Sequence, residues 1–133
     1  MIDQETQHKL LAAANNVRKN AYAPYSNYHV GSAVLTENGE IVVGCNVENA
    51  CYNLGACSER NTLSHAIALG HNKFKALALV TEDGGFPCGG CRQFIWQLCG
   101  DIPLIVSDKN GKVETCQSST LLPRAFELDP NNR

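Results

Sequence analysis

The sequence predicts an α/β fold in which helices pack on the faces of a five-stranded sheet. Stretches with apolar residues at helical spacing alternate with short apolar runs of strand length, in the order α-β-β-α-β-α-β-β-α. An Asn-Gly pair at 38–39, between two apolar runs, is a strong signal for a hairpin. The chain has 133 residues, 44% of them hydrophobic, which is enough to bury one core. We therefore expect a single domain over residues 1–133.

The N-terminal half is predicted to hold one helix and a β-hairpin. Residues 3–20 have apolar side chains at helical spacing, and Asp3 is suited to be the N-cap. Strands are expected at 30–36 and 41–45, on either side of the Asn-Gly turn. The stretch 46–56 is polar and rich in Asn and small residues, so we expect a loop.

The C-terminal half is predicted to hold two central helices. The first spans 58–69 and ends at Gly70, and the second spans 88–99. Shorter elements are expected around them, namely strands at 74–81, 103–106 and 112–116 and a short helix at 119–122.

The charge distribution favours a small-molecule substrate. The net charge is −2 and no block of basic residues occurs, whereas proteins that bind duplex nucleic acid usually carry a basic stripe. No apolar run reaches the length of a membrane span. The first residues lack the basic and apolar regions of a secretory signal. We therefore expect no nucleic-acid partner, no membrane association and a cytoplasmic location.

Two cysteine units, Cys57-Ser-Glu59 and Pro87-Cys88-Gly-Gly-Cys91, form the most informative motif. Three thiolates can hold a zinc ion and leave its fourth tetrahedral position open, as in catalytic zinc sites. Both units lie at predicted helix starts, where unpaired N–H groups stabilise thiolates. Glu59 follows the first thiolate by two residues and is placed to move protons there. The combination matches the zinc deaminase signature.

Zinc held by three thiolates carries a formal charge of −1 and is a weak Lewis acid, so the site needs compensating positive charge. Each helix N-terminus supplies about half a charge. Arg60 directly follows Glu59, and we expect its guanidinium to hydrogen-bond the thiolates.

Other interpretations of the cysteines stay open. A Cys-x-x-Cys at a helix start also resembles a thioredoxin-like redox site, although that leaves the first cysteine unit unexplained. A zinc-stabilised binding module without catalysis would give Glu59 no role and would need a fourth ligand. A structural zinc also needs a fourth thiolate, for which the sequence offers Cys45, Cys51 and Cys99.

Several segments beyond these units carry a family resemblance over nearly the whole chain. They are APYSNYHVG at 23–31, GCNVENA at 44–50, CSER at 57–60, PCGGCRQ at 87–93 and LLPRAF at 121–126. Together they resemble the small, homotetrameric, zinc-dependent cytidine deaminase family. The resemblance implies a three-layer α-β-α fold with a mixed sheet. It also implies hydrolytic deamination of cytidine and 2′-deoxycytidine to the uracil nucleosides with release of ammonia, a step of pyrimidine salvage.

The resemblance further implies a role for each matching position. Cys57, Cys88 and Cys91 would bind zinc, and Glu59 would shuttle protons between water, ring N3 and the leaving ammonia. The nucleoside would contact the ribose-binding pair Asn46 and Glu48, the base-lining Tyr28, the main chain at Ala56 and, from a neighbouring subunit, the stacking ring of Phe126.

The sequence departs from the family pattern beside the site. Ser58, Asn61 and Thr62 replace smaller or less polar residues, and we expect Ser58 to be tolerated and the other two to alter packing. Tyr28 stands where the family commonly has Phe, and a buried hydroxyl there needs a partner. The loop 82–86 is shorter than usual.

Two rival substrates belong to the same enzyme class. One is a modified aminopyrimidine nucleoside such as blasticidin S, against which the ribose-binding pair Asn46 and Glu48 argues. The other is cytosine within nucleic acid, against which the acidic balance argues.

Overall fold

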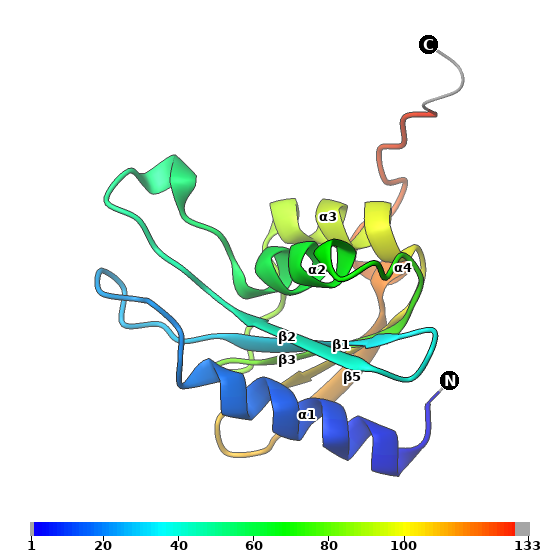
Figure 1. The fold of residues 1–133 in the computed structure, drawn as a ribbon, viewed down its shortest axis with the longest axis horizontal. Coiled ribbons are helices and arrows are strands. Elements are labelled where there is room, and N and C mark those ends of the chain that lie inside the picture. The colour runs from blue at the N-terminus through cyan, green and yellow to red at the C-terminus, as the bar shows by residue number, and fades with distance from the viewer. Residues whose placement is uncertain (1, 130–133) are drawn as a thin grey trace.

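In the computed structural model, which describes residues 2–129, the chain forms three layers (Figure 1). One long helix covers one face of a five-stranded sheet, and two helices cover the other face. The predicted three-layer α/β fold is confirmed. The single domain predicted for 1–133 stays a prediction, and residues 1 and 130–133 lie outside the described part. No helix within residues 2–129 combines the length and apolarity that crossing a membrane requires.

All the predicted helices and strands are present, with ends that differ by one or two residues. The elements are α1 (Gln4–Arg18), β1 (Gly31–Thr36), β2 (Ile41–Cys45), η1 (Tyr52–Leu54), α2 (Ser58–Ala68), β3 (Phe74–Val80), α3 (Gly89–Cys99), β4 (Pro103–Ser107), β5 (Val113–Gln117) and α4 (Ser118–Leu121). The stretch 46–56 has more structure than the predicted loop. It contains η1, and Val47 pairs with both Tyr22 and Ala56 in isolated bridges.

The sheet has the strand order β2-β1-β3-β4-β5. Only the β3–β4 pair is parallel among the described strands, because α3 makes the crossover between them, and the other three pairs are antiparallel. In the register, Val34 of β1 faces Val42 of β2 and Leu77 of β3, and Leu77 faces Leu104 of β4. The sheet is therefore mixed, as the resemblance implied.

Alternate residues of the same strands build two cores, because successive side chains in a strand point to opposite faces. On one face, Leu10 and Ala14 of α1 pack with Ala33, Ala78 and Ile105. The other face joins α2 and α3 to the sheet through the buried side chains Leu63, Ala66, Ile95, Val34, Leu77 and Leu104. Since both faces are covered, every residue of β1 is buried.

The helix starts follow the sequence signals. The Asp3 carboxylate accepts a 2.7 Å hydrogen bond from the Thr6 amide and so caps α1. Gly70, with φ of +97°, follows the end of α2, as predicted. The N-cap positions of α2 and α3 are occupied by Cys57 and Cys88, and neither side chain makes a capping hydrogen bond. Cys57 and Cys88 therefore stand at the N-termini of α2 and α3, which cover the same face of the sheet (Figure 1).

Candidate active site

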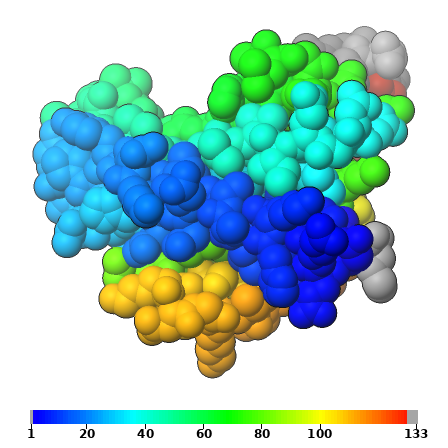
Figure 2. Space-filling model, turned by 60° about the horizontal axis from the view of Figure 1, so that its bottom comes forward, coloured from blue at the N-terminus to red at the C-terminus, as the bar shows by residue number. Residues whose placement is uncertain are grey.

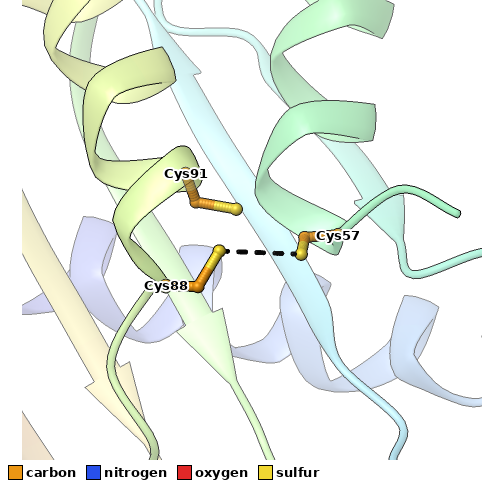
Figure 3. Close-up of side chains that lie close together, drawn as sticks. All are labelled: Cys57, Cys88 and Cys91. Atoms are coloured by element: carbon orange, nitrogen blue, oxygen red, sulfur yellow. Dashed lines mark hydrogen bonds between the residues drawn. The ribbon is translucent and has the colours of Figure 1, made fainter. Parts of the chain in front are cut away.

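The three predicted metal ligands meet at the starts of α2 and α3 (Figure 3). The sulfurs of Cys57, Cys88 and Cys91 all lie within 4.8 Å of one another, and the Cys57–Cys88 pair is 4.0 Å apart. A tetrahedral zinc with Zn–S bonds of about 2.3 Å places its sulfurs about 3.8 Å apart. The donor set and its spacing therefore fit a zinc ion that keeps one open coordination position.

The environment of the cluster already favours a thiolate. The pKa of Cys57 is lowered to about 5 by the hydrogen bond from the Cys91 thiol, with further contributions from Arg60 and Cys88. The same hydrogen bond, together with burial, raises the pKa of Cys91. The Cys91 thiol is therefore the donor to Cys57, and a bound cation would take the place of its proton. Arg60 also donates a 3.2 Å hydrogen bond to the Gly55 carbonyl, which holds its guanidinium beside the cluster.

The other cysteines do not complete a fourth corner. Within residues 2–129, the group of side chains that could hold a metal ion does not include Cys45, Cys51 or Cys99. The Cys51 thiol instead donates to the Asn53 side chain at 2.9 Å, and burial raises the pKa of Cys99 to about 12. The closed four-cysteine zinc site is therefore not supported. Convergence of the Cys-x-x-Cys with Cys57 likewise leaves no isolated redox pair of the thioredoxin kind.

Glu59 lies next to the cluster, in the first turn of α2. Its side chain is buried, with 4% of the residue exposed, and burial raises the pKa of its carboxyl group to about 7. Within residues 2–129 Glu59 forms no ion pair, and a buried carboxylate without one is unusual among structural residues. Glu59 lines the same cavity as Cys57 and Cys88.

That cavity has a volume of about 460 Å³, within the range of small-molecule sites. Its lining residues come from the segments 26–30, 46–60 and 79–88. The segments 20–30 and 46–56 lie against each other at one end of the molecule (Figure 2). The cavity lining includes the predicted nucleoside-binding residues Tyr28, Asn46, Glu48 and Ala56, together with Arg60. Of the predicted site residues, only Phe126 and the buried Cys91 are missing from this lining.

Asn46 and Glu48 also organise the loop in front of β1. The Asn46 side chain donates to the Tyr28 carbonyl at 2.8 Å and accepts from the Val30 amide at 2.9 Å. The Glu48 carboxylate accepts from the Tyr25 amide at 2.9 Å, and from both the amide and the hydroxyl of Ser26. These bonds lower the pKa of Glu48, the Ser26 hydroxyl contributing most. The two side chains therefore hold the loop that carries Tyr28 while they face the cavity.

Ala56 contributes a wall of the cavity through a paired backbone. Its amide donates to the Val47 carbonyl at 2.9 Å, and its carbonyl accepts from the Val47 amide at 3.0 Å. The Asn61 side chain donates to the Cys45 carbonyl at 2.8 Å and, more weakly, to the Ala56 carbonyl at 3.4 Å. Asn61 thus fixes the strand that leads into Cys57.

The departures Ser58 and Thr62 form a buried hydroxyl cluster with Ser32 of β1. The Ser32 hydroxyl bonds to the Ser58 hydroxyl and, at 2.9 Å, to the Thr62 hydroxyl. Ser58 also donates to the Gly44 carbonyl at 3.1 Å. The first turn of α2 is therefore tied to β1 and β2, so these polar residues are accommodated by hydrogen bonds.

Phe126 lies outside the cavity of its own chain. It is 68% exposed, and its carbonyl accepts a 3.0 Å hydrogen bond from the Gln93 side chain of α3. The segment that carries it leaves the body of the molecule after α4 (Figure 1).

Sequence reasoning missed several residues of the cavity. They come mainly from loops, where no periodic pattern marks them, and include Ser26, Val47, Tyr52, Thr81, Gly85 and Phe86. The short loop 82–86 was noticed from its length alone, and nothing in the sequence indicated which of its side chains face the cavity.

Known proteins resemble this chain in both sequence and structure. Residues 4–106 match the family model described as the cytidine and deoxycytidylate deaminase zinc-binding region. A cytidine deaminase of Sporosarcina psychrophila is 42% identical over 124 residues, which cover 91% of each chain. A cytidine deaminase of Mycobacterium tuberculosis (strain H37Rv) is 38% identical over 118 residues, covering 87% of this chain and 86% of that one.

Solved structures extend the similarity to the fold. The crystal structure of cytidine deaminase from Burkholderia pseudomallei superposes with a TM-score of 0.85 at 43% identity, covering 90% of this chain and 98% of that chain. The cytidine deaminase structure from Mycobacterium tuberculosis superposes with a TM-score of 0.81 at 34% identity, covering 96% and 100%.

Proposed function

This chain belongs to the cytidine deaminase family, and on that premise we propose that it hydrolyses cytidine to uridine and ammonia in the cavity described above. One observation carries the proposal. A three-thiolate cluster and a buried carboxylate, Glu59, converge at a single cavity of suitable size. Neither a closed structural site nor a redox pair needs that carboxylate.

The cysteine cluster would hold zinc, which when bound supplies a Lewis acid that makes water nucleophilic near neutral pH. Glu59 would take a proton from the attacking water and deliver protons to N3 of the pyrimidine and then to the departing amine. A C–O bond forms at C4, the C4–N bond breaks, and ammonia leaves. Burial keeps Glu59 away from bulk water, so its protons pass to the substrate.

The remaining cavity residues would bind the nucleoside. Asn46 and Glu48 are proposed to hold the ribose hydroxyls, since both face the cavity and are fixed by their bonds to the loop at 25–30. Tyr28 and the backbone at Ala56 are proposed to line the base. Because these residues would contact both the sugar and the base of a nucleoside, we also propose 2′-deoxycytidine as a substrate and pyrimidine salvage as the role. All seven cysteines are free thiols, which is typical of a reducing compartment such as the cytoplasm.

The reaction is tested by an ultraviolet assay of the zinc-quantified protein with cytidine and 2′-deoxycytidine. Wild type is expected to produce the uracil nucleosides. Glu59→Gln should keep its zinc and lose nearly all turnover, with a loss of at least about 100-fold. Glu40→Gln is a matched control, because Glu40 is exposed and pairs with His71 at the far end of β2. Full activity of Glu59→Gln would refute the assignment, and an inactive wild type with bound zinc would point to another aminopyrimidine.

We propose further that the protein is a homotetramer whose sites are shared between subunits. Phe126 is large, apolar and exposed, and it lies outside the cavity of its own chain. It would stack on the pyrimidine bound by a neighbour. Phe126→Ala is then expected to weaken substrate binding by about tenfold, with little effect on the chemical step.

Mixing two variants tests the shared site. In a tetramer built from Phe126→Ala and Glu59→Gln subunits, some sites combine an intact Glu59 with an intact Phe126 only if the two come from different chains. Coexpressed mixtures should therefore exceed the activity of Phe126→Ala alone at low cytidine concentration. Activity that merely equals the average of the separate variants would disprove sharing.

A further inference from the structure

Two loops that are distant in the sequence meet in one wall of the cavity. The loop 23–30 contributes Tyr28, and the loop 82–86 contributes Gly85 and Phe86. The Tyr28 hydroxyl crosses from the first loop to the second and donates a 2.7 Å hydrogen bond to the Asp83 carboxylate. Asp83 itself is exposed and does not line the cavity.

Asp83 is held in place by its own loop. The same carboxylate oxygen accepts from the Gly85 amide at 3.1 Å and from the Thr81 hydroxyl at 3.4 Å. The Thr81 hydroxyl oxygen in turn accepts from the amides of Gly84 and Gly85, at 2.7 and 2.9 Å. Thr81 is buried and Gly84 has a positive φ of +77°. The acceptor for Tyr28 is therefore part of a fixed turn.

Tyr28 is closely fitted at this position. Its ring and that of Phe86 pack on the small core cluster of Val30, Leu79 and Val106. A methyl group added at Gly85 would lie 3.1 Å from the Tyr28 hydroxyl, which is tighter than an ordinary contact. Burial raises the pKa of Tyr28, and the Tyr28 hydroxyl is the main cause of a lowered pKa at Asp83, so the phenol is the donor and the carboxylate the acceptor.

An ion pair fixes the backbone of the same two loops independently. Arg18 donates to the His29 carbonyl at 2.8 Å and to the Glu82 carboxylate at 2.6 Å. Lys109 also contacts Glu82, at 3.3 Å. Loss of the Tyr28–Asp83 bond should therefore release the Tyr28 side chain and loosen the turn at 83–85, without unfolding either loop.

We propose that Asp83 is a positioning residue for substrate binding, which holds the Tyr28 ring in the cavity wall and so sets the affinity for the pyrimidine nucleoside. The inference rests on the proposed function for its substrate. Asp83 touches neither the cysteine cluster nor Glu59 among its described hydrogen bonds. Its effect is therefore expected in KM and not in the chemical step.

A double-mutant cycle tests this pair. Tyr28→Phe and Asp83→Ala should each raise KM for cytidine about 3- to 10-fold, with kcat within about twofold of wild type. The double variant should be no worse than Asp83→Ala, because the Tyr28–Asp83 hydrogen bond is lost in all three variants. Asp83→Asn should recover most of the affinity, since its amide oxygen can accept the hydrogen bond from the Tyr28 hydroxyl. Tyr22→Phe is the matched control, because Tyr22 is exposed and lies outside the cavity.

Amide hydrogen exchange gives a readout that does not depend on turnover. In Tyr28→Phe, the amides of Gly84 and Gly85 should exchange several-fold faster than in wild type, while Tyr22→Phe should leave them unchanged. Independent, multiplicative effects on KM, or unchanged exchange at these glycines, would overturn the inference. If the wild type does not deaminate cytidine but Tyr28→Phe still shows the faster exchange, the proposed substrate is wrong while Asp83 remains the residue that positions Tyr28.

Discussion

At the scale of single residues, the site depends on charges held where water is scarce. The Cys57 thiolate lies at a helix N-terminus beside Arg60, and both features stabilise its negative charge. Cys91 is buried on α3, and its hydrogen bond to Cys57 together with this burial raises the pKa of its thiol. A metal ion would bind all three sulfurs at once, so the cluster acts as one unit.

Two cysteines on α3, the buried Cys91 and the partly buried Cys99, provide a matched comparison. Cys91→Ala should abolish stoichiometric zinc binding, because two thiolates do not hold zinc tightly at neutral pH. Cys99→Ala should retain about one zinc per chain, since Cys99 packs at the edge of the core beside α2 and the sheet. Zinc content after gel filtration, measured by atomic absorption, distinguishes them. Full zinc in Cys91→Ala would exclude Cys91 as a ligand.

Arg60 is expected to tune the cluster by its charge. Arg60→Ala should lower zinc affinity by roughly tenfold and reduce turnover, because residues that hydrogen-bond metal ligands typically contribute 10- to 100-fold. Arg60→Lys keeps the positive charge but loses the planar guanidinium, so its zinc affinity should lie between those of the wild type and Arg60→Ala. Competition with a chelating dye measures the affinity. Unchanged affinity and turnover in Arg60→Ala would remove Arg60 from the site.

At the scale of elements, close approach between helices and strands sets the geometry of the cluster. Gly31 opens β1 directly beneath the end of α1, and Gly44 in β2 lies against Thr62 of α2. The hydroxyl cluster of Ser32, Ser58 and Thr62 adds polar ties at the same level. The first turn of α2, which carries Cys57 and Glu59, is therefore fixed to the sheet by both packing and hydrogen bonds.

Gly31→Ala is expected to destabilise the fold strongly. The added methyl group would collide with the Ala14 carbonyl and lie 2.8 Å from the Arg18 amide, both of which are backbone groups that cannot rotate away. We expect a loss of about 3 kcal/mol in the free energy of unfolding. Gly70→Ala is the comparison, since it meets no atom within 4 Å and adds only the strain of a positive φ, about 1 kcal/mol. Urea denaturation measures both, and a smaller loss for Gly31→Ala than for Gly70→Ala would contradict the close contact.

The sequence predicted the elements well, because their signals are local. The Asn-Gly turn, the N-cap Asp3 and the terminating Gly70 each act within a few residues. The stretch 46–56 was less predictable. Val47 finds its partners Tyr22 and Ala56 at distances along the chain that no local pattern reports.

At the scale of the whole molecule, the cluster connects two helices that otherwise meet only through their packing. Cys57 is the N-cap of α2 and Cys88 the N-cap of α3, so an ion bound between them (Figure 3) would cross-link two helices that strand β3 separates in the sequence. A bound ion would close the chain between Cys57 and Cys91 into a loop. Its loss is therefore expected to lower the stability of the whole domain.

Metal removal should therefore lower thermal stability. An ion present at 100 times its dissociation constant adds about 2.7 kcal/mol to stability. For a domain of this size the loss corresponds to a decrease of roughly 10 °C in Tm. Thermal unfolding followed by circular dichroism, with and without a chelator, measures the shift. Cys91→Ala should not respond to the chelator, and an equal response in that variant would place the metal elsewhere.

The sequence by itself determined the chemistry of this protein. The residue types and spacing of Cys57, Glu59, Cys88 and Cys91, and the order of the elements that carry them, follow from local signals and from motifs that are contiguous in the chain. Only the tertiary structure decided which side chains complete the site. The hydrogen bonds from Tyr28 to Asp83 and from Ser26 to Glu48 join residues far apart in the sequence. The structure also places Phe126 outside the cavity of its own chain. Such contacts are fixed by how the sheet and its loops pack, and packing is a property of the whole chain.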